Sequence, residues 1–192
     1  MARDGRVESG FESAADALRA ASHRSDLVVR EIPSPGDIAP FSIAFAGDVR
    51  PDSHGDSPYG TGRFILLHDP DEPEAWGGPW RVVTFAQAPL EPEIGTDPLL
   101  ADVAWSWLTD ALASRGAAYR AISGTATKTV SRGFGTLADQ GDGSQIELRA
   151  SWSPESPSEA HIEAWVELVC MLAGLPPGSE DIAVLRAGPR HP

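Results

Sequence analysis

Four arginines lie inside segments with strand character, at Arg63, Arg81, Arg120 and Arg149. Cations are scarce in this chain, which has 15 Lys and Arg against 28 Asp and Glu. If these side chains converge on the exposed face of one sheet, they form a surface that binds an anion or a peptide. If they scatter, they pair with surface carboxylates and contribute little. Trp105, on the flank of a predicted helix, is either a further contact for a partner or a half-buried residue with its indole N–H in water.

A second candidate site combines a histidine with acidic residues. His68 and Asp69 stand at the end of a predicted strand, where they could act as a general base and its orienting carboxylate. Glu91, Glu93 and Asp97 form an acidic loop whose oxygens could hold a hard cation. Each feature also has a structural explanation, because Asp suits a turn and carboxylates stabilise a helix N-terminus without any metal. An enzyme or small-ligand binder that used these groups would need one pocket joining them.

The motifs of common catalytic and metal sites are missing. The five histidines do not have the spacing of a metal site. Cys170 is the single cysteine, so the chain can form no internal disulfide and no thiolate cluster, and its apolar neighbours predict a buried, inert thiol. The sequence has no G-x-S-x-G elbow, Walker loop or strand-linked G-x-G-x-x-G motif. We therefore expect no metal and no cofactor, and the pattern favours a non-enzymatic protein.

Length and composition indicate one domain. A chain of 192 residues has the size of a single domain, which we place at residues 1–177, followed by a poorly ordered or lightly docked tail at 178–192. The net charge of −13 is unfavourable for binding a phosphate backbone. The N-terminus lacks the apolar run of a signal peptide, and no window approaches the ~20 apolar residues of a membrane span. The sequence thus predicts an acidic, soluble, cytoplasmic protein with no membrane partner.

Three segments have the apolar period of a helix, at residues 9–24, 97–115 and 156–173. The first and the third open with the Ser and Glu spacing of a capping box. The second and the third are followed by Gly116 and Gly174, which supply the left-handed conformation that ends a helix. Each of these helices has one apolar face, so all three are expected to cover the same side of a sheet.

Six segments have strand character, and the order of elements is α–β–β–β–β–α–β–β–α. The spacers between successive strands are short, which requires antiparallel pairing, because a parallel crossover needs a dozen or more residues. Gly124 is a plausible bulge in the fifth strand. We predict an α+β fold with an antiparallel sheet of about six strands and three helices on one face. The predicted strands are 27–32, 41–46, 63–68, 80–87, 118–130 and 145–152.

Five stretches carry a resemblance to a known family: FESAADALRAA, TGRFILLHDP, TDPLLADVAWSWLTDAL, IELRASWSP and AHIEAWVELVCMLAGLPP. They resemble an uncharacterised family of high-GC Gram-positive bacteria, domain of unknown function number three thousand, over most of residues 11–177. That resemblance implies no activity and carries over no functional residues. The order of elements is also similar to that of small acidic secretion-chaperone-like proteins, which bind partner polypeptides as dimers; this similarity concerns the fold alone.

Three functional hypotheses follow from these observations. The first is a protein-binding, adaptor or chaperone-like domain whose sheet face or flanking tryptophans receive a polypeptide, with a homodimer as one assembly that it could form. The alternative is a small-ligand binder or enzyme that uses His68, Asp69 and the Glu91–Asp97 loop. The third is an RNA-associated factor, which would need a local basic face despite the overall negative charge.

Overall fold

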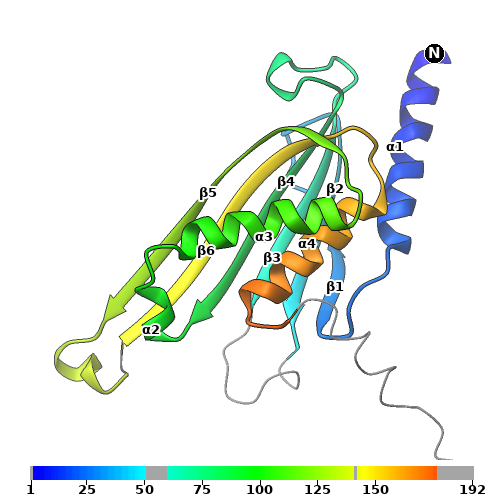
Figure 1. The fold of residues 1–192 in the computed structure, drawn as a ribbon. Coiled ribbons are helices and arrows are strands. Elements are labelled where there is room, and N and C mark those ends of the chain that lie inside the picture. The colour runs from blue at the N-terminus through cyan, green and yellow to red at the C-terminus, as the bar shows by residue number, and fades with distance from the viewer. Residues whose placement is uncertain (1, 51–59, 141, 177–192) are drawn as a thin grey trace, which may run out of the picture.

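The computed structural model describes residues 2–50, 60–140 and 142–176, and it confirms the α+β class with an antiparallel sheet (Figure 1). The helices are α1 (Ala2–Ala20), α2 (Pro92–Gly95), α3 (Leu100–Ser114) and α4 (Glu159–Leu172), with two 3₁₀ helices, η2 (Glu74–Trp76) and η3 (Gly135–Gln140). The strands are β1 (Leu27–Ile32), β2 (Phe41–Val49), β3 (Thr61–His68), β4 (Trp80–Leu90), β5 (Tyr119–Arg132) and β6 (Asp142–Pro154).

The six strands form one sheet in the order β1-β2-β3-β4-β6-β5, and every neighbouring pair is antiparallel. The first four strands follow one another across the sheet, as their short connections require. After β4 the chain passes through α2 and α3 to the far edge, where it forms β5. It then returns as β6 between β4 and β5, so β1 and β5 are the two edge strands of the sheet.

Helices α1, α3 and α4 cover one face of the sheet, where the hydrophobic core lies (Figure 1). The strands contribute alternate residues to this layer because successive side chains of a strand point to opposite faces. Its largest fully buried side chains include Trp152 of β6, Trp165 of α4 and Phe64 of β3. This face is therefore a packed core, and the opposite face of the sheet carries none of these three helices.

Two glycines allow α4 to approach the sheet closely. Gly47 and Gly62 are direct partners in the register of β2 and β3. A Cβ atom on Gly47 would lie 2.7 Å from the ring of Trp165, and one on Gly62 would lie 2.8 Å from Cγ2 of Val169. The indole of Trp165 also donates a hydrogen bond to the carbonyl of Phe85, at 3.4 Å. The missing side chains thus create the space that the tryptophan fills.

The ends of the helices differ from the predicted ones. α1 begins at Ala2 and ends at Ala20, so Ser9 lies inside the helix and is not its cap. α3 begins at Leu100 because Asp97 accepts a hydrogen bond from the N–H of Leu99 in the turn before it, at 2.9 Å. The short α2 fills a segment that was expected to be irregular. α4 lacks a side-chain hydrogen bond at its N-cap, so the predicted capping box is not formed.

The early end of α1 has a packing reason. The Arg24 side chain, which is 5% exposed, pairs with Asp26 at 2.5 Å and with Glu167 of α4 at 3.2 Å. Glu167 and Glu163 of α4 in turn accept hydrogen bonds from Arg115, both at 2.9 Å. The chain must therefore leave its helix before residue 24 to bring this arginine to α4. The charges form a structural network, buried at Arg24 and partly exposed at Arg115, that joins the α1–β1 connection to α3 and α4.

The long edge strand β5 has its irregularity at a different place from the expected one. The register with β6 shifts between Arg120 and Ser123, and Ala121 within this bulge has a φ of 51°. Gly124 is instead a point of close approach, because a Cβ atom there would lie 2.4 Å from the backbone oxygen of Arg149 in β6 and 2.7 Å from the ring of Trp105 in α3. The glycine therefore allows β6 and α3 to approach β5 closely, and the bulge contains an alanine in the left-handed region.

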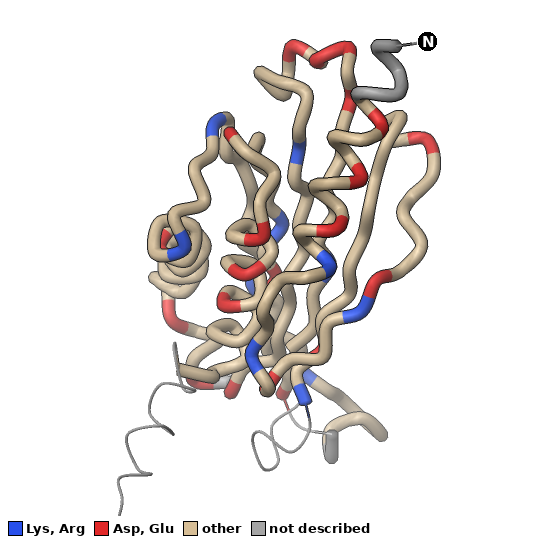
Figure 2. Tube along the Cα trace, turned by 90° about the vertical axis from the view of Figure 1, so that its right-hand side faces the viewer, with Lys and Arg blue, Asp and Glu red and all other residues tan. Residues whose placement is uncertain are grey.

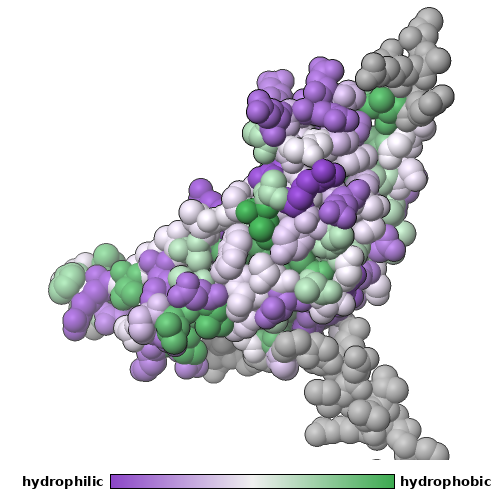
Figure 3. Space-filling model, turned by 45° about the horizontal axis from the view of Figure 1, so that its top comes forward, coloured by the Kyte–Doolittle hydropathy of each residue, from purple (hydrophilic) through white to green (hydrophobic). Residues whose placement is uncertain are grey.

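The β5–β6 hairpin extends beyond the core and ends in exposed apolar side chains. Val130 is 62% exposed, Phe134 76% and Leu137 53%. Hydrophobic side chains are also visible at this end of the molecule in Figure 3. No described helix is long and apolar enough to cross a membrane. The predicted tail at 178–192 lies outside the described residues.

Candidate functional site

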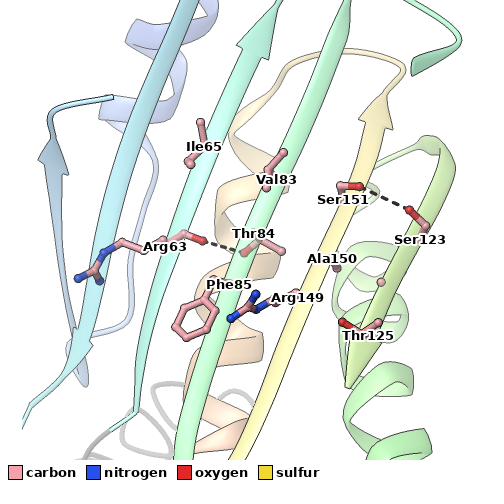
Figure 4. Close-up of a pocket in the computed structure, with 11 residues that line it drawn as sticks. Arg63, Ile65, Val83, Thr84, Phe85, Ser123, Thr125, Arg149, Ala150 and Ser151 are labelled. Atoms are coloured by element: carbon pink, nitrogen blue, oxygen red, sulfur yellow. Dashed lines mark hydrogen bonds between the residues drawn. The ribbon is translucent and has the colours of Figure 1, made fainter. Parts of the chain in front are cut away.

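A groove of about 610 Å³ lies on the sheet face opposite the helices (Figure 4). Its lining comes from four neighbouring strands and from no helix or loop. The floor is apolar, with Val83 and Phe85 of β4 and Ile65 of β3, and Val83 is 37% exposed. Hydroxyl groups and two guanidinium groups surround this floor. The lining residues are Arg63, Ile65, Val83, Thr84, Phe85, Ser123, Gly124, Thr125, Arg149, Ala150 and Ser151.

The strand register places Arg63, Phe85 and Arg149 in one row across the sheet. Arg63 of β3 pairs with Phe85 of β4, and Phe85 pairs with Arg149 of β6. The two arginines therefore lie on either side of the phenylalanine, as Figure 4 shows. The guanidinium carbon of Arg149 is 5.9 Å from the centroid of the Phe85 ring, which is within cation–π range. Its Nε also contacts a carboxylate oxygen of Glu147, at 2.6 Å.

Arg63 makes no ion pair within the described part of the chain. Its guanidinium donates to the carbonyl of Gly62 at 2.7 Å and to the hydroxyl of Thr61 at 3.4 Å. The charge of Arg63 acts on the carboxylate of Asp48. Burial raises the pKa of that group, but hydrogen bonds from Thr61 and Arg30 and the charges of Arg30 and Arg63 together lower it. That carboxylate is already held by hydrogen bonds from Thr61 and Arg30. Arg63 thus retains donors for an anion.

Arg81 lies on the same face, but its guanidinium is already hydrogen-bonded to residues of β5 and β6. It donates to the hydroxyls of Ser151 at 2.5 Å and Ser153 at 3.2 Å, and to the carbonyl of Ala121 in the bulge at 3.0 Å. Ser153 donates in turn to the carbonyl of Trp76 in η2, at 2.6 Å. Burial lowers the pKa of this guanidinium, which still carries its charge at neutral pH. Arg81 of β4 is therefore linked by hydrogen bonds to β5 and, through Ser153, to η2, and it adds positive charge beside the groove.

The other two predicted contacts lie outside the groove. Arg120 precedes the bulge of β5, and its guanidinium would be 3.6 Å from a Cβ atom placed on Gly78. Trp105 of α3 is half-buried on the helical side, against Gly124. The structure therefore brings Arg63, Arg81, Arg120 and Arg149 to one face of the sheet, with two of them in the groove, and leaves Trp105 on the other face.

Arginines outnumber carboxylates on the open face, which is the reverse of the chain as a whole. Strand alternation and register place five arginines and two carboxylates on this face among the described strand positions: Arg30, Arg63, Arg81, Arg120, Arg149, Asp48 and Glu147. Many Asp and Glu residues lie along the helices and in connections between elements, as Figure 2 shows. The positive face is thus a local feature of an acidic protein.

His68 is a core residue in this structure. It is 6% exposed, and its ring lies 4.1 Å from that of Trp80 by centroid, with Phe11 and Phe41 also in contact. Burial lowers its pKa, while the charge of Asp69 opposes this effect. The Asp69 carboxylate accepts a hydrogen bond from the N–H of Asp71, at 2.9 Å, as expected for a turn residue. These contacts support the structural explanation for both residues.

The His68–Asp69 pair and the acidic loop lie at opposite ends of the sheet. His68 pairs with Trp80, the first residue of β4, whereas Glu91 follows Leu90, the last residue of that strand. The 11 residues of β4 separate these ends, and ten steps of about 3.3 Å along an extended strand amount to about 33 Å. The structure therefore does not form the shared pocket that the enzyme hypothesis requires. Among the described residues, no group of three or more His, Cys, Asp or Glu could hold a metal ion.

Sequence reasoning identified the arginines of the groove but missed its floor and hydroxyl groups. The predicted strand 80–87 contains Val83 and Phe85, but the prediction did not say which side of the sheet these two residues face. They alternate with the buried Val82 and Ala86. That alternation was a usable signal for an exposed apolar pair. The hydroxyls from β5 and β6 could not be found in this way, because they reach the groove only through the placement of β6 beside β4.

Comparisons with known proteins give one match. A family model described as "Protein of unknown function (DUF3000)" matches residues 7–182. No curated protein and no solved structure matches the chain. The family carries no assigned activity, so the groove and its chemistry are the basis for a functional assignment.

Proposed function

We propose that this chain, which belongs to the DUF3000 family of proteins of unknown function, is a non-enzymatic binding protein that receives an acidic segment of a polypeptide partner on its open sheet face. The observation that carries the proposal is the row of Arg63, Phe85 and Arg149 in the groove. An apolar floor between two guanidinium groups suits a ligand with carboxylates and hydrophobic side chains. Arginine is well suited to this task because its planar donors match a carboxylate in two places.

The shape of the groove favours a polypeptide over a small molecule. A typical small-ligand pocket encloses most of its ligand. Here all lining residues belong to β3, β4, β5 and β6, so the groove offers contacts from one side only. A partner that covers the surrounding sheet as well as the groove buries more surface than a small molecule could. The net charge of −13 also opposes a nucleic-acid ligand, whose affinity depends on cations.

Native mass spectrometry of the protein purified from cells of its own source tests this proposal. The expected result is a complex with a second polypeptide of different mass. A monomer that carries a few hundred extra daltons would overturn the proposal in favour of a small-molecule site. A homodimer without any other polypeptide would also overturn it.

Substitutions in the groove locate the binding surface. Arg63→Ala and Arg149→Ala should each weaken the complex on the order of ten-fold, which corresponds to the loss of about 1.4 kcal/mol from one charged hydrogen bond. Arg132→Ala is the matched control, since it removes the same charge from the far end of β5, where the side chain is 72% exposed. Equal affinity of all three variants and the parent protein would place the partner elsewhere.

A further inference from the structure

We infer that the partner segment presents two carboxylates about 10 Å apart with an apolar side chain between them. The inference rests on the proposed function, because it names the chemistry of the segment that the groove would accept. Arg63 and Arg149 stand on strands that are separated by β4 alone. Two strand spacings of about 4.8 Å give the separation of their backbone positions. In the arrangement that Figure 4 shows, the Phe85 ring lies between the two guanidinium groups, so a separate carboxylate is needed for each of them.

Each arginine has donors left for one carboxylate. Arg63 uses its guanidinium on a backbone carbonyl and a hydroxyl, and it has no carboxylate partner within 4.0 Å among the described residues. Arg149 gives Nε to Glu147, with its side chain 67% exposed. A free guanidinium near water binds a carboxylate weakly when it acts alone. Two such contacts to one ligand add their free energies, so recognition depends on both carboxylates being present.

The space between the two arginines requires an apolar group. Phe85 lies directly between them in the row, and Val83 and Ile65 occupy the neighbouring row. A polar group over this floor would lose its water without gaining a hydrogen-bond partner. The hydroxyls of Ser123 and Ser151, which are 3.5 Å apart, lie beyond this floor at the β5 side. The groove is therefore expected to select partner segments in which an apolar side chain lies between two carboxylates.

Linear dicarboxylates test the two-point geometry without assuming a conformation of the partner. Nonanedioate is the probe, since its extended chain holds two carboxylates roughly 10 Å apart with methylene groups between them. Nonanoate has the same chain with one carboxylate, and pentanedioate has two carboxylates on a chain about half as long. Amide chemical shifts of the full-length protein, recorded by NMR during titration at low salt, report both the site and the affinity.

Nonanedioate should bind roughly ten-fold more tightly than either comparison compound, with the largest shifts at the groove strands. Arg63→Ala and Arg149→Ala should each reduce its affinity to that of nonanoate, whereas Arg132→Ala should leave the ten-fold preference intact. Equal binding of the three compounds, shifts outside the groove, or no binding at millimolar concentration would overturn the inference.

Failure of the proposed function and failure of the two-carboxylate inference would give different results. In one case a polypeptide co-purifies and its binding requires Arg63, but nonanedioate binds no more tightly than the comparison compounds. This result would support the proposed function and refute the inference of two carboxylates. In the other case nonanedioate binds as expected, but the purified protein carries a small molecule. This result would support the two-carboxylate geometry of the groove and refute a polypeptide partner.

Discussion

His161 should make this protein less stable in mild acid. Its ring is 2% exposed, and its Nδ1 accepts a hydrogen bond from the indole N–H of Trp152, at 3.1 Å. The other nitrogen then carries the proton and donates to the carbonyl of Ser156, also at 3.1 Å. Protonation at Nδ1 would make the imidazole N–H face the indole N–H of Trp152, which breaks their hydrogen bond, and it would place a positive charge in the core. The informative substitution is His161→Gln, because glutamine cannot take up this charge.

The magnitude follows from the change in pKa between the unfolded and folded chain. Burial lowers the pKa of His161 from 6.5 to about 4, against a smaller opposing effect of the Ser156 carbonyl. The unfolded chain thus binds a proton between these two values that the folded chain does not. The contribution is fully present above pH 6.5 and is lost as the pH falls toward 4. The difference of about 2.5 corresponds to about 3 kcal/mol.

Urea unfolding at pH 7, 5.5 and 4, followed by tryptophan fluorescence, measures this effect. Burial also lowers the pKa values of His23 and His68, so the parent protein alone reports a sum of contributions. The difference in unfolding free energy between the parent and His161→Gln removes the contributions that both proteins share. This difference should shrink by about 3 kcal/mol from pH 7 to pH 4. A difference that stays constant within about 0.5 kcal/mol would refute the reasoning.

Three further predictions concern packing, charge and reactivity. Gly62→Ala should lower the unfolding free energy by about 1–3 kcal/mol in urea, because the new Cβ atom would lie 2.8 Å from Val169. Glu167→Ala should cost about 1–3 kcal/mol in the same assay, since it removes one of the two carboxylates that pair with Arg24, whose side chain is 5% exposed. Cys170 should resist a thiol reagent such as DTNB until urea unfolds the protein, because the thiol is fully buried and burial raises its pKa to about 12.

Two matched variants serve as controls. Gly10→Ala adds the same methyl group at a position with nothing within 4 Å, so it should leave stability unchanged or raise it by up to about 1 kcal/mol. Arg132→Ala removes an exposed charge and should change stability by less than about 0.5 kcal/mol. If Gly62→Ala unfolds like Gly10→Ala, the close approach of α4 is wrong. If Glu167→Ala unfolds like Arg132→Ala, or the folded thiol reacts as fast as the unfolded one, the corresponding argument fails.

Local patterns in the sequence were sufficient for the elements and the fold class. The alternation in β6 and the short apolar run of β3 each predicted a strand that the structure contains. Gly116 has a φ of 65° after α3, as its place behind a helical period indicated. These features depend on neighbours within a few residues, which the sequence displays directly. Helix starts were predicted less well: α1 begins at Ala2, before the expected Ser9, and α3 begins only after the turn in which Asp97 accepts a hydrogen bond from Leu99.

The binding face was decided by tertiary structure. The sequence placed four arginines in strands but did not fix the register that sets Arg63 and Arg149 on either side of Phe85. It also did not show that β6 would pair with β4, and this placement brings the hydroxyls of β5 and β6 to the groove. Strand period alone assigns a residue to one of two faces. Which face the helices cover, and which strands become neighbours, depends on packing between segments that are far apart in the chain.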